Sequence, residues 1–406
     1  MKKLLTATFL LSFALWNCQS NQEPGPVPVD EGFYNQLQEK LILAEPGDVI
    51  EIPEGQYELD RPLSLDGISN ITIKGAGMDK TILSFRMQKV GAEGLRVTAD
   101  SVTIADLTIQ DTKGDAVKLQ DCQGITLRNI KTTWSGGASE ENGGYGLYPV
   151  SSTNVLVEGC EASYASDAGI YVGQCKNVVV RNCYAHENVA GIEIENCVNS
   201  EVYDNRSEHN TGGILVFDLP DLPQVNGHSC RVYSNKIIEN NHKNFAPEGN
   251  IVGTVPPGTG IILLAAKKVE IFDNEIIGHK TMGTTVSSYH ITEKPWNDQN
   301  YDPYSYDIYI HDNTYQRKKA IPDLSKDFGK LINVLFPGKP QDIIYDGILN
   351  PNYGDGANPM NICIQQNPEE LRFANVDAAN DFDNVQKDLA PYNCNGFEME
   401  EVKLDL

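Results

Sequence analysis

Residues 168–189 and 190–211 are two consecutive copies of one 22-residue pattern. Their sequences are AGIYVGQCKNVVVRNCYAHENV and AGIEIENCVNSEVYDNRSEHNT, and the apolar positions coincide. A fixed period in the twenties is typical of a solenoid, in which each turn buries its apolar face only by stacking on the next. Because the unit consists of short Val/Ile strands separated by Asn and Gly turns, the pattern predicts an all-β solenoid.

Related units continue on both sides of this pair. The first strand of each coil is expected at 95–98, 117–120, 147–150, 170–173, 192–195, 214–217, 261–264 and 284–287, with a second strand after each. Residues 33–44 have helical apolar spacing, and short alternating strands follow them. We expect this segment to cover the first coil, because an open end exposes apolar core and unpaired strand edges. Residues 321–406 lose the period, apart from a short helix expected at 324–336, and are interpreted as an irregular C-terminal capping extension to a β-helix spanning 31–320.

Several residue types recur at equivalent positions of the coils, where they would stack into ladders. Two asparagine columns are expected, Asn188, Asn210, Asn240 and Asn205, Asn235, Asn274, Asn313. Six cysteines lie in the repeats, at positions 122, 160, 175, 183, 197 and 230. We interpret the asparagines as structural and the cysteines as free, packed thiols, since a buried thiol behaves as a small hydrophobe. Cys363 and Cys394 flank an irregular segment and are candidates for a disulfide.

The N-terminus has the pattern of an export signal. Lys2 and Lys3 precede an apolar run that is too short to span a bilayer. The run ends at Cys18 in a sequence that resembles a bacterial lipobox, which predicts a signal peptide over 1–17 and a lipid-modified Cys18. Residues 18–30 are polar and proline-rich and suit a tether. The protein is therefore expected to be an exported outer-membrane or cell-surface lipoprotein, or a secreted protein if Cys18 is not lipidated.

The net charge is −24, from 56 acidic and 32 basic residues. A protein that grips a phosphate backbone needs clustered Lys and Arg, so nucleic acid is not an expected partner. The acidic surface suits divalent cations or neutral ligands, or serves solubility alone. We expect a monomer.

Strand alternation assigns the faces of the first strands. The outward columns are Lys118, Tyr148, Tyr171, Glu193, Leu215, Ile262, Thr285 and Gln120, Val150, Gly173, Glu195, Phe217, Leu264, Ser287. Four long insertions border these columns, at 131–145, 218–229, 242–258 and 290–306. In a repeat protein, the face bordered by long loop insertions is usually the face that binds a ligand or carries the active site. We therefore expect a groove, with Trp134, Phe217, Phe245 and Trp296 as candidate substrate-binding residues.

The segments GDVIEIPEGQYEL, SDAGIYVGQ, AGIEIEN and GGILVFDLP resemble the right-handed parallel β-helix proteins of the pectate-lyase-like superfamily. Within it, the chain is most similar to exported bacterial parallel β-helix repeat proteins without an established activity. The resemblance covers about residues 46–315 and implies a right-handed single-stranded parallel β-helix with a link to carbohydrate. The Asp-Pro-His-Asp/Glu run of mannuronan epimerases and the Arg-x-Pro-x-x-Arg pattern of pectate lyases are absent. The fold transfers, and the catalytic motifs do not.

The groove carries residues suited to acid–base chemistry on a sugar, which needs a proton donor and an acceptor on one face. Lys118 or Tyr171 could be the base of a uronan lyase or epimerase, and Tyr148 the acid. Paired carboxylates of a hydrolase are the alternative, either Glu193 with Glu195 or Asp167 with Glu193. Oxygen ligands for Ca²⁺, the one candidate cofactor, are Asp115, Asp167 and Glu193. The same residues also suit plain solvent exposure and stacking.

Two functional hypotheses follow. The first is a cell-envelope lipoprotein that acts on polysaccharide through this groove, with a lyase, epimerase or hydrolase activity. The second is a non-catalytic glycan-binding or structural lipoprotein that uses the same face. An open cleft with convergent Lys118, Tyr171 and Glu193 side chains would favour the enzyme. A cleft filled by the inserted loops would favour the non-catalytic protein.

Overall fold

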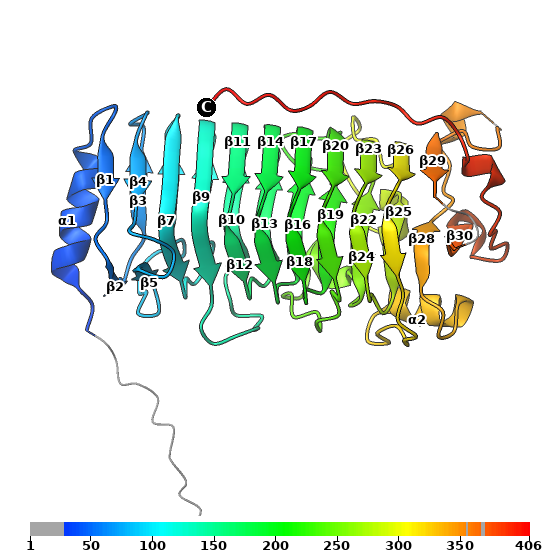
Figure 1. The fold of residues 1–406 in the computed structure, drawn as a ribbon, viewed down its shortest axis with the longest axis horizontal. Coiled ribbons are helices and arrows are strands. Elements are labelled where there is room, and N and C mark those ends of the chain that lie inside the picture. The colour runs from blue at the N-terminus through cyan, green and yellow to red at the C-terminus, as the bar shows by residue number, and fades with distance from the viewer. Residues whose placement is uncertain (1–27, 355, 367–369) are drawn as a thin grey trace, which may run out of the picture.

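The computed structural model describes residues 28–354, 356–366 and 370–406. Within them the chain forms a single-stranded parallel β-helix, drawn in Figure 1 with its axis horizontal. The predicted signal peptide, Cys18 and most of the tether lie outside the described residues. No helix in the described part of the chain is long and apolar enough to cross a membrane.

Each coil contributes to three faces. Face 1 consists of β3 (Leu63–Asp66), β6 (Leu95–Thr98), β8 (Val117–Gln120), β10 (Tyr145–Val150), β13 (Ala168–Gly173), β16 (Ala190–Glu195), β19 (Gly212–Phe217), β22 (Thr259–Leu264), β25 (Met282–Ser287), β28 (Gln341–Tyr345) and β30 (Phe373–Asn375). Face 2 consists of β1 (Val49–Glu51), β4 (Thr72–Lys74), β7 (Val102–Gln110), β9 (Gln123–Thr133), β11 (Thr153–Glu158), β14 (Lys176–Arg181), β17 (Val198–Tyr203), β20 (His228–Tyr233), β23 (Lys267–Phe272), β26 (Tyr306–His311) and β29 (Ile362–Gln365).

Face 3 carries the short third strand of most coils. It consists of β2 (Gly55–Glu58), β5 (Thr81–Ser84), β12 (Glu161–Ser163), β15 (Tyr184–His186), β18 (Arg206–Glu208), β21 (Lys236–Ile238), β24 (Glu275–Ile277) and β27 (Thr314–Gln316). The ends of β7 and β9 continue onto this face and pair with β5 and β12. All strand pairs are parallel, so every coil repeats the path of the previous one.

The predicted alternation on face 1 is confirmed. The inward residues of its strands, such as Leu147, Ile170 and Ile192, are fully buried in one core that runs through the solenoid. The asparagine columns also form as predicted. The side-chain oxygen of Asn210 accepts the backbone N–H of Asn188 at 2.9 Å, and Asn240 does the same for Asn210 at 3.0 Å. These amides satisfy the backbone where each coil turns.

The first coil is covered by α1 (Glu31–Ile42), whose Leu37 and Leu41 are buried. Asp30 begins the helix by accepting the N–H of Phe33 at 2.8 Å. Gln38 then bonds both backbone groups of Ser64, accepting from its N–H at 2.9 Å and donating to its oxygen at 3.0 Å. The side chain of Gln38 thus takes the place of a further strand at the edge of face 1.

The C-terminal boundary predicted at residue 320 is too early. Strands β28, β29 and β30 continue faces 1 and 2 beyond it, pairing with β25, β26 and β28. The expected helix exists as α2 (Asp327–Leu335), and its Ile332 packs on Met282 and Ile344, outside face 1. Short 3-10 helices lie at Ile251–Thr254 (η1), Tyr289–Thr292 (η2), Pro351–Tyr353 (η3), Ala378–Asn380 (η4) and Ala390–Tyr392 (η5).

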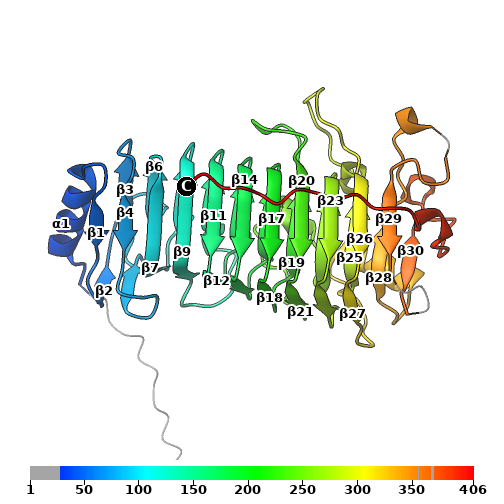
Figure 2. The same cartoon turned by 45° about the horizontal axis from the view of Figure 1, so that its top comes forward.

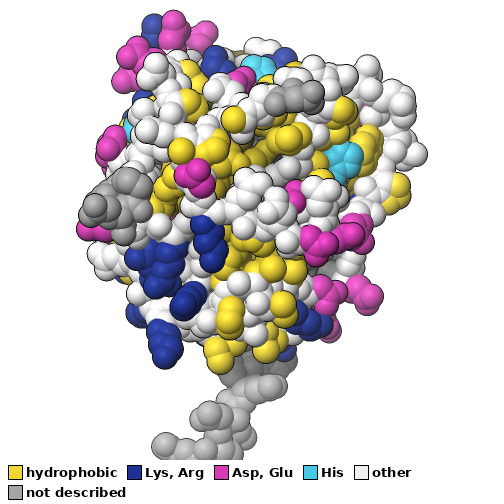
Figure 3. Space-filling view, turned by 90° about the vertical axis from the view of Figure 1, so that its right-hand side faces the viewer, with side chains coloured by type: hydrophobic (Ala, Val, Ile, Leu, Met, Phe, Trp, Pro, Cys, Tyr) yellow, Lys and Arg dark blue, Asp and Glu magenta, His cyan; other side chains and the backbone are white. Residues whose placement is uncertain are grey.

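The end of the solenoid near α2 is seen directly in Figure 3, where apolar side chains remain at the surface beside a group of Lys and Arg side chains. Exposed apolar residues of this segment include Ile321, Leu324 and Val334. The disulfide expected between Cys363 and Cys394 is present. The six repeat cysteines are free and buried, as predicted.

After the disulfide, residues 395–406 form an extended segment that we call the strap. It runs back along face 2 from β29 to β9, as both Figure 1 and Figure 2 show. The chain therefore ends beside the early coils, far from the C-terminal end of the solenoid.

Candidate functional site

The predicted outward column on face 1 forms with the predicted register. Tyr148 pairs with Lys118 on one side, and Tyr171 pairs with Glu193 on the other. The Tyr148 and Tyr171 ring centroids are 5.0 Å apart. Parallel strands place equivalent residues about 4.8 Å apart, so the column brings together residues from four successive coils.

A cluster of tyrosines forms the centre of this column. Tyr145, which ends the first long insertion, has its ring centroid 4.5 Å from that of Tyr148 and 4.4 Å from that of Tyr171. Lys118 places its Nζ 4.9 Å from the centroid of the Tyr148 ring. Tyr145 was not among the predicted site residues, although its place between a long insertion and a strand is a signal that could have found it.

The phenols of this cluster are poor bases. Burial raises the pKa of Tyr148 to about 12. Burial, with the nearby Glu195 carboxyl, raises the pKa of Tyr171 well above its usual value. The hydroxyl of Tyr171 instead donates to Oε1 of Glu195 at 2.6 Å. Tyr171 is therefore a protonated hydrogen-bond donor in this arrangement, which does not support the predicted role as a catalytic base.

Three carboxyl groups lie beneath the surface beside these tyrosines. Burial raises the pKa of Asp167 and of Glu195 to about 7, and it raises that of Glu193 well above the usual range. Asp167 accepts a hydrogen bond of 2.8 Å from the Asn250 side chain, whereas Oε2 of Glu193 is buried without a partner. Burial without a cation disfavours the charged form, so Glu193 holds its proton at neutral pH, whereas Asp167 and Glu195 titrate close to neutrality.

The inserted loops seal this part of face 1. Val252 and Val255, in the loop at 242–258, are buried against Leu215, Phe217 and Ile262 of the outward columns. Glu193 and Tyr171 are only 1% and 3% exposed as a result. The groove expected over β13 to β22 is therefore filled by the protein's own side chains.

A buried ion pair holds the other two loops in place. Lys267 donates from Nζ to Oδ2 of Asp218 at 2.6 Å, and both side chains are almost fully buried. The backbone N–H of Gly227 donates to Oδ1 of Asp218 at 2.9 Å. Tyr301, from the loop at 290–306, donates its hydroxyl to the Asp218 carbonyl at 2.6 Å. This pair links two insertions to face 2, and neither partner was predicted to matter.

The aromatic residues expected to wall the groove have other positions. Trp134 is buried in the solenoid core and donates its indole N–H to the Thr112 carbonyl at 2.7 Å. Phe217 is buried beneath the loops. Phe245 and Trp296 are partly buried and pack against the same apolar cluster. Trp134 and Phe217 are thus unavailable to a ligand, because packing uses their rings.

The N-terminal half of face 1 remains open. Its outward column continues from Tyr148 through Lys118 to the exposed Arg96. Asp115 lies beside Lys118 and is partly exposed, and burial raises its pKa to about 6 while Lys118 opposes the shift. Two cationic side chains, one tyrosine ring and one carboxyl group are therefore presented together on this surface.

The calcium site expected at Asp115, Asp167 and Glu193 does not form. Within the described ranges, no group of three or more His, Cys, Asp or Glu side chains could hold a metal ion. Glu193 is sealed and faces no cation, and Asp167 is occupied by the Asn250 amide. Without converging oxygens, these residues do not suit a cation that needs six or more ligands.

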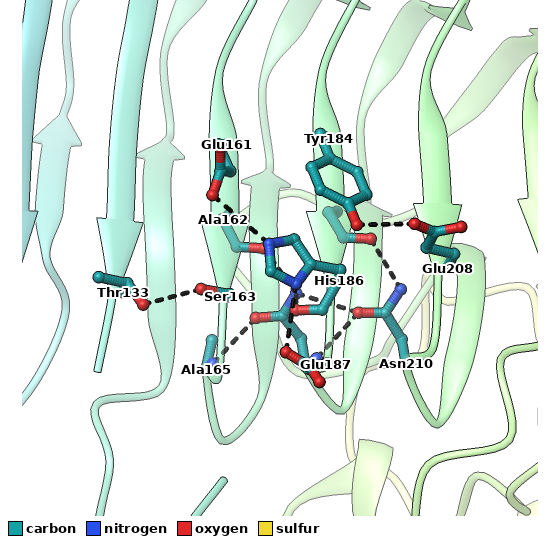
Figure 4. A network of polar contacts seen from close by, with 12 residues as sticks. Thr133, Glu161, Ala162, Ser163, Ala165, Tyr184, His186, Glu187, Glu208 and Asn210 are labelled. Carbon is teal, nitrogen blue, oxygen red and sulfur yellow. Dashed lines mark hydrogen bonds and ion pairs between the residues drawn. The ribbon is translucent and has the colours of Figure 1, made fainter. Parts of the chain in front are cut away.

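A second polar network lies on face 3 (Figure 4). His186 stacks on Tyr184 with 4.3 Å between ring centroids and lies between Glu161 and Glu187, whose carboxylate oxygens are 3.5 and 3.3 Å from its two ring nitrogens. The neighbouring His186 ring, together with Lys131, lowers the pKa of Glu161 to about 2. Because each ring nitrogen lies near a carboxylate, this network ties neighbouring coils together, although Nε2 of His186 makes no hydrogen bond.

Comparisons with known proteins agree with the architecture. A family model described as "Right handed beta helix region" matches residues 93–252 and 138–294. The preneck appendage protein of Bacillus phage PZA is 25% identical over 232 residues, and that of Bacillus phage phi29 is 24% identical over the same length. The match covers 47% of this chain, and the chain spans only 27% of the length of each relative.

Solved structures with a similar chain path were also found. The A-module of a mannuronan C-5 epimerase from Azotobacter vinelandii has 15% identity and a TM-score of 0.46, with 74% of this chain and 82% of that chain covered. A polygalacturonase from Erwinia carotovora ssp. carotovora has 10% identity and a TM-score of 0.49, with 70% and 89% covered.

Proposed function

Because this chain is a right-handed parallel β-helix protein with its acidic cluster sealed under its own loops, we propose that it binds an acidic polysaccharide without cleaving it. The binding surface is the open half of face 1, with Arg96, Lys118 and Tyr148. One observation carries this choice. Tyr171 and Glu195, two of the candidate catalytic residues of this column, are bonded to each other and buried.

The exposed column has the chemistry that a uronic acid polymer requires. Arg96 and Lys118 pair across adjacent strands, so their cationic ends can meet carboxylates on successive sugars. A guanidinium binds a carboxylate through two parallel hydrogen bonds. The Tyr148 ring offers an apolar surface to a sugar ring, and its hydroxyl keeps its proton because the pKa is raised to about 12. The surface therefore combines charge recognition with stacking.

A second candidate function, hydrolysis, has one observation in its favour. Asp115 and Asp167 flank Gly144, where an added Cβ would lie 3.7 Å from Oδ1 of Asp115 and 3.8 Å from Cβ of Asp167. Their pKa values are raised to about 6 and about 7. Glycoside hydrolases use two carboxyl groups, one protonated as the acid and one ionised. In such a mechanism the more buried Asp167 would donate the proton, and Asp115 would activate water.

The test compares binding and turnover on the same panel of glycans. Calorimetry with alginate, polygalacturonate and a neutral glucan should show binding to the uronates only. Arg96→Ala and Lys118→Ala should each weaken it by about tenfold, the loss of roughly one charge-assisted hydrogen bond. Lys268→Ala, an exposed cation on face 2, is the matched control. Absence of binding to every uronate would refute the proposal.

Product analysis separates the two candidates. New reducing ends that appear with the wild-type protein and disappear in Asp115→Asn would establish the hydrolase. Ultraviolet-absorbing unsaturated ends would indicate a lyase. Neither product, together with retained uronate binding, is the result expected here.

Attachment to the cell envelope is part of the same proposal and rests on the sequence. A lipid on Cys18 would hold the β-helix outside the membrane through the tether at 18–30. Metabolic labelling with a palmitate analogue should mark the wild-type protein and not Cys18→Ala, which should appear in the medium instead. Equal labelling of both proteins would exclude this anchor.

A further inference from the structure

The strap crosses face 2 from β29 to β9. At its start, the Phe397 ring centroid lies 6.1 Å from that of Tyr309 on β26. Near its end, the carbonyl oxygen of Asp405 lies 3.7 Å from the position that a Cβ on Gly124 of β9 would take. Figure 2 shows the segment passing over the intervening strands.

The strap is stretched close to its limit. Between β26 and β9 lie six strand-to-strand steps, through β23, β20, β17, β14 and β11. At about 4.8 Å per step, this distance is about 29 Å. The eight Cα–Cα steps from residue 397 to residue 405 span at most about 26–29 Å when fully extended. The strap therefore runs along the solenoid axis in a nearly extended conformation.

Figure 2 shows the strap passing over the strands that carry one outward column of face 2, which we call the track: Leu156, Val179, Glu201, Arg231, Glu270 and Tyr309. Outward-facing side chains of a solenoid are normally exposed to solvent, yet Leu156 and Val179 are only 5% and 4% exposed. On the strap, the apolar residues Phe397, Met399, Val402 and Leu404 are partly buried, and Glu398, Glu400, Glu401 and Lys403 are exposed. The strap thus presents apolar side chains to the track and mostly acidic ones to water.

Side chains, rather than the backbone, hold the strap in place. Among the described residues, no backbone–backbone hydrogen bond involves residues 395–406. A strand that joins a sheet edge would form a ladder of such bonds. The covalent link to the solenoid is close by, at the Cys363–Cys394 disulfide. The contact resembles a bound peptide whose effective concentration is raised by its tether.

We propose that the track is a polypeptide-binding site which the strap occupies in cis and which accepts the same segment from a second copy of this chain. The occupant must be extended, with apolar side chains on one side and carboxylates on the other. Leu156 and Val179 provide the apolar contact. At the centre of the track, the guanidinium of Arg231 is already bonded to Glu201 at 2.8 Å and to Glu270 at 3.1 Å, so the carboxylates of the occupant face water. This site is separate from the glycan surface proposed on face 1, so either proposal can fail alone.

The experiment opens the site in the full-length protein. A protease recognition sequence is inserted between Cys394 and Asn395, the purified protein is cleaved, and the released strap is removed by gel filtration. A fluorescent peptide of residues 395–406, which stands for the strap of a second copy, is then titrated and followed by anisotropy. We expect saturable binding to the cleaved protein and at least tenfold weaker binding to the uncleaved protein, whose track is occupied.

Matched controls test the specificity of this binding. Val179→Glu in the cleaved protein should abolish it, whereas Lys176→Glu, an exposed position on the same strand, should leave the apolar contact intact. A peptide of the same composition in scrambled order should not bind. Absence of binding to a cleaved protein that keeps its thermal unfolding midpoint would overturn the proposal, and so would equal binding of the scrambled peptide. Displacement of the peptide by uronate polymer would instead assign the track to polysaccharide.

A second variant covers the case in which cleavage disrupts the fold. Leu404→Asp in the uncleaved chain places a charge against the track and should weaken the strap in cis. This variant should then bind the labelled peptide at least tenfold more tightly than the wild-type protein does. No gain in peptide binding would overturn the proposal.

Discussion

Asp167→Asn should stabilise the protein at alkaline pH, because it removes the contribution of one buried carboxyl group to the pH dependence of its stability. Asp167 is 8% exposed, lies next to two further carboxyl groups, and has the Asn250 amide as its polar partner. An amide in its place fits the same space and can still accept the hydrogen bond from Asn250. It cannot ionise, and the difference between the two proteins therefore isolates the cost of a buried charge.

The magnitude follows from the pKa. Burial raises the pKa of Asp167 to about 7, against about 3.9 for an aspartate in an unfolded chain. Between these values the native state holds a proton that the unfolded state has lost, so the free energy of unfolding falls as the pH rises through this window. At about 1.36 kcal/mol per pH unit, the loss reaches an upper limit of about 4 kcal/mol above pH 7 and is absent at about pH 4.

Urea unfolding at several pH values from about 4 to about 8.5 measures this effect. The free energies of the two proteins should differ least at the acidic end, and the gap in favour of Asp167→Asn should widen with pH and level off above about 7. Asp79→Asn, at an exposed position, is the control and should parallel the wild-type curve. Parallel curves for wild type and Asp167→Asn would refute the view that this carboxyl is buried without a compensating cation.

Three further changes test the contacts that organise the molecule, each by urea unfolding. Lys267→Met leaves the Asp218 carboxylate buried without a partner and should lower the free energy of unfolding by about 3–5 kcal/mol. Adding Asp218→Asn should recover most of this loss. No recovery would show that the packing of Lys267, rather than its charge, stabilises the protein. Reducing or replacing the Cys363–Cys394 disulfide, which closes a loop of 31 residues, should cost about 4 kcal/mol, and an unchanged midpoint would contradict this. Asn210→Ala orphans buried backbone groups of adjacent coils and should cost about 3 kcal/mol, so a loss under about 1 kcal/mol would show that water replaces the ladder.

The repeat predicts local structure well because its rules are local. Two aligned copies place Tyr171 beside Glu193, and the side-chain period of two makes Ile170 and Ile192 core residues. The same alignment predicts the asparagine ladders, since equivalent positions must stack once the coils do. These features follow from the order of residues within one coil and need no knowledge of the loops.

The site depended on contacts that the repeat does not encode. Asn250 reaches Asp167 across 83 residues, and Lys267 reaches Asp218 across 49. The insertions mark face 1 correctly, but their sequences do not say whether they wall a groove or fill it. Trp134 was wrongly predicted to line the groove for the same reason, because an aromatic ring in a loop can pack into the core as readily as it can contact a ligand.

The C-terminal end of the solenoid could not be predicted, for a different reason. Strands β28, β29 and β30 join the sheets after long irregular spacers, so the sequence period does not predict them. The strap has an alternating pattern, yet its partner is the track on strands more than 80 residues earlier in the chain. The sequence by itself determined the solenoid, its register and its ladders, because a repeated local pattern admits one way of stacking. Only the tertiary structure decided that the loops close over the acidic cluster and that the strap covers face 2, because both depend on packing between segments that share no repeat.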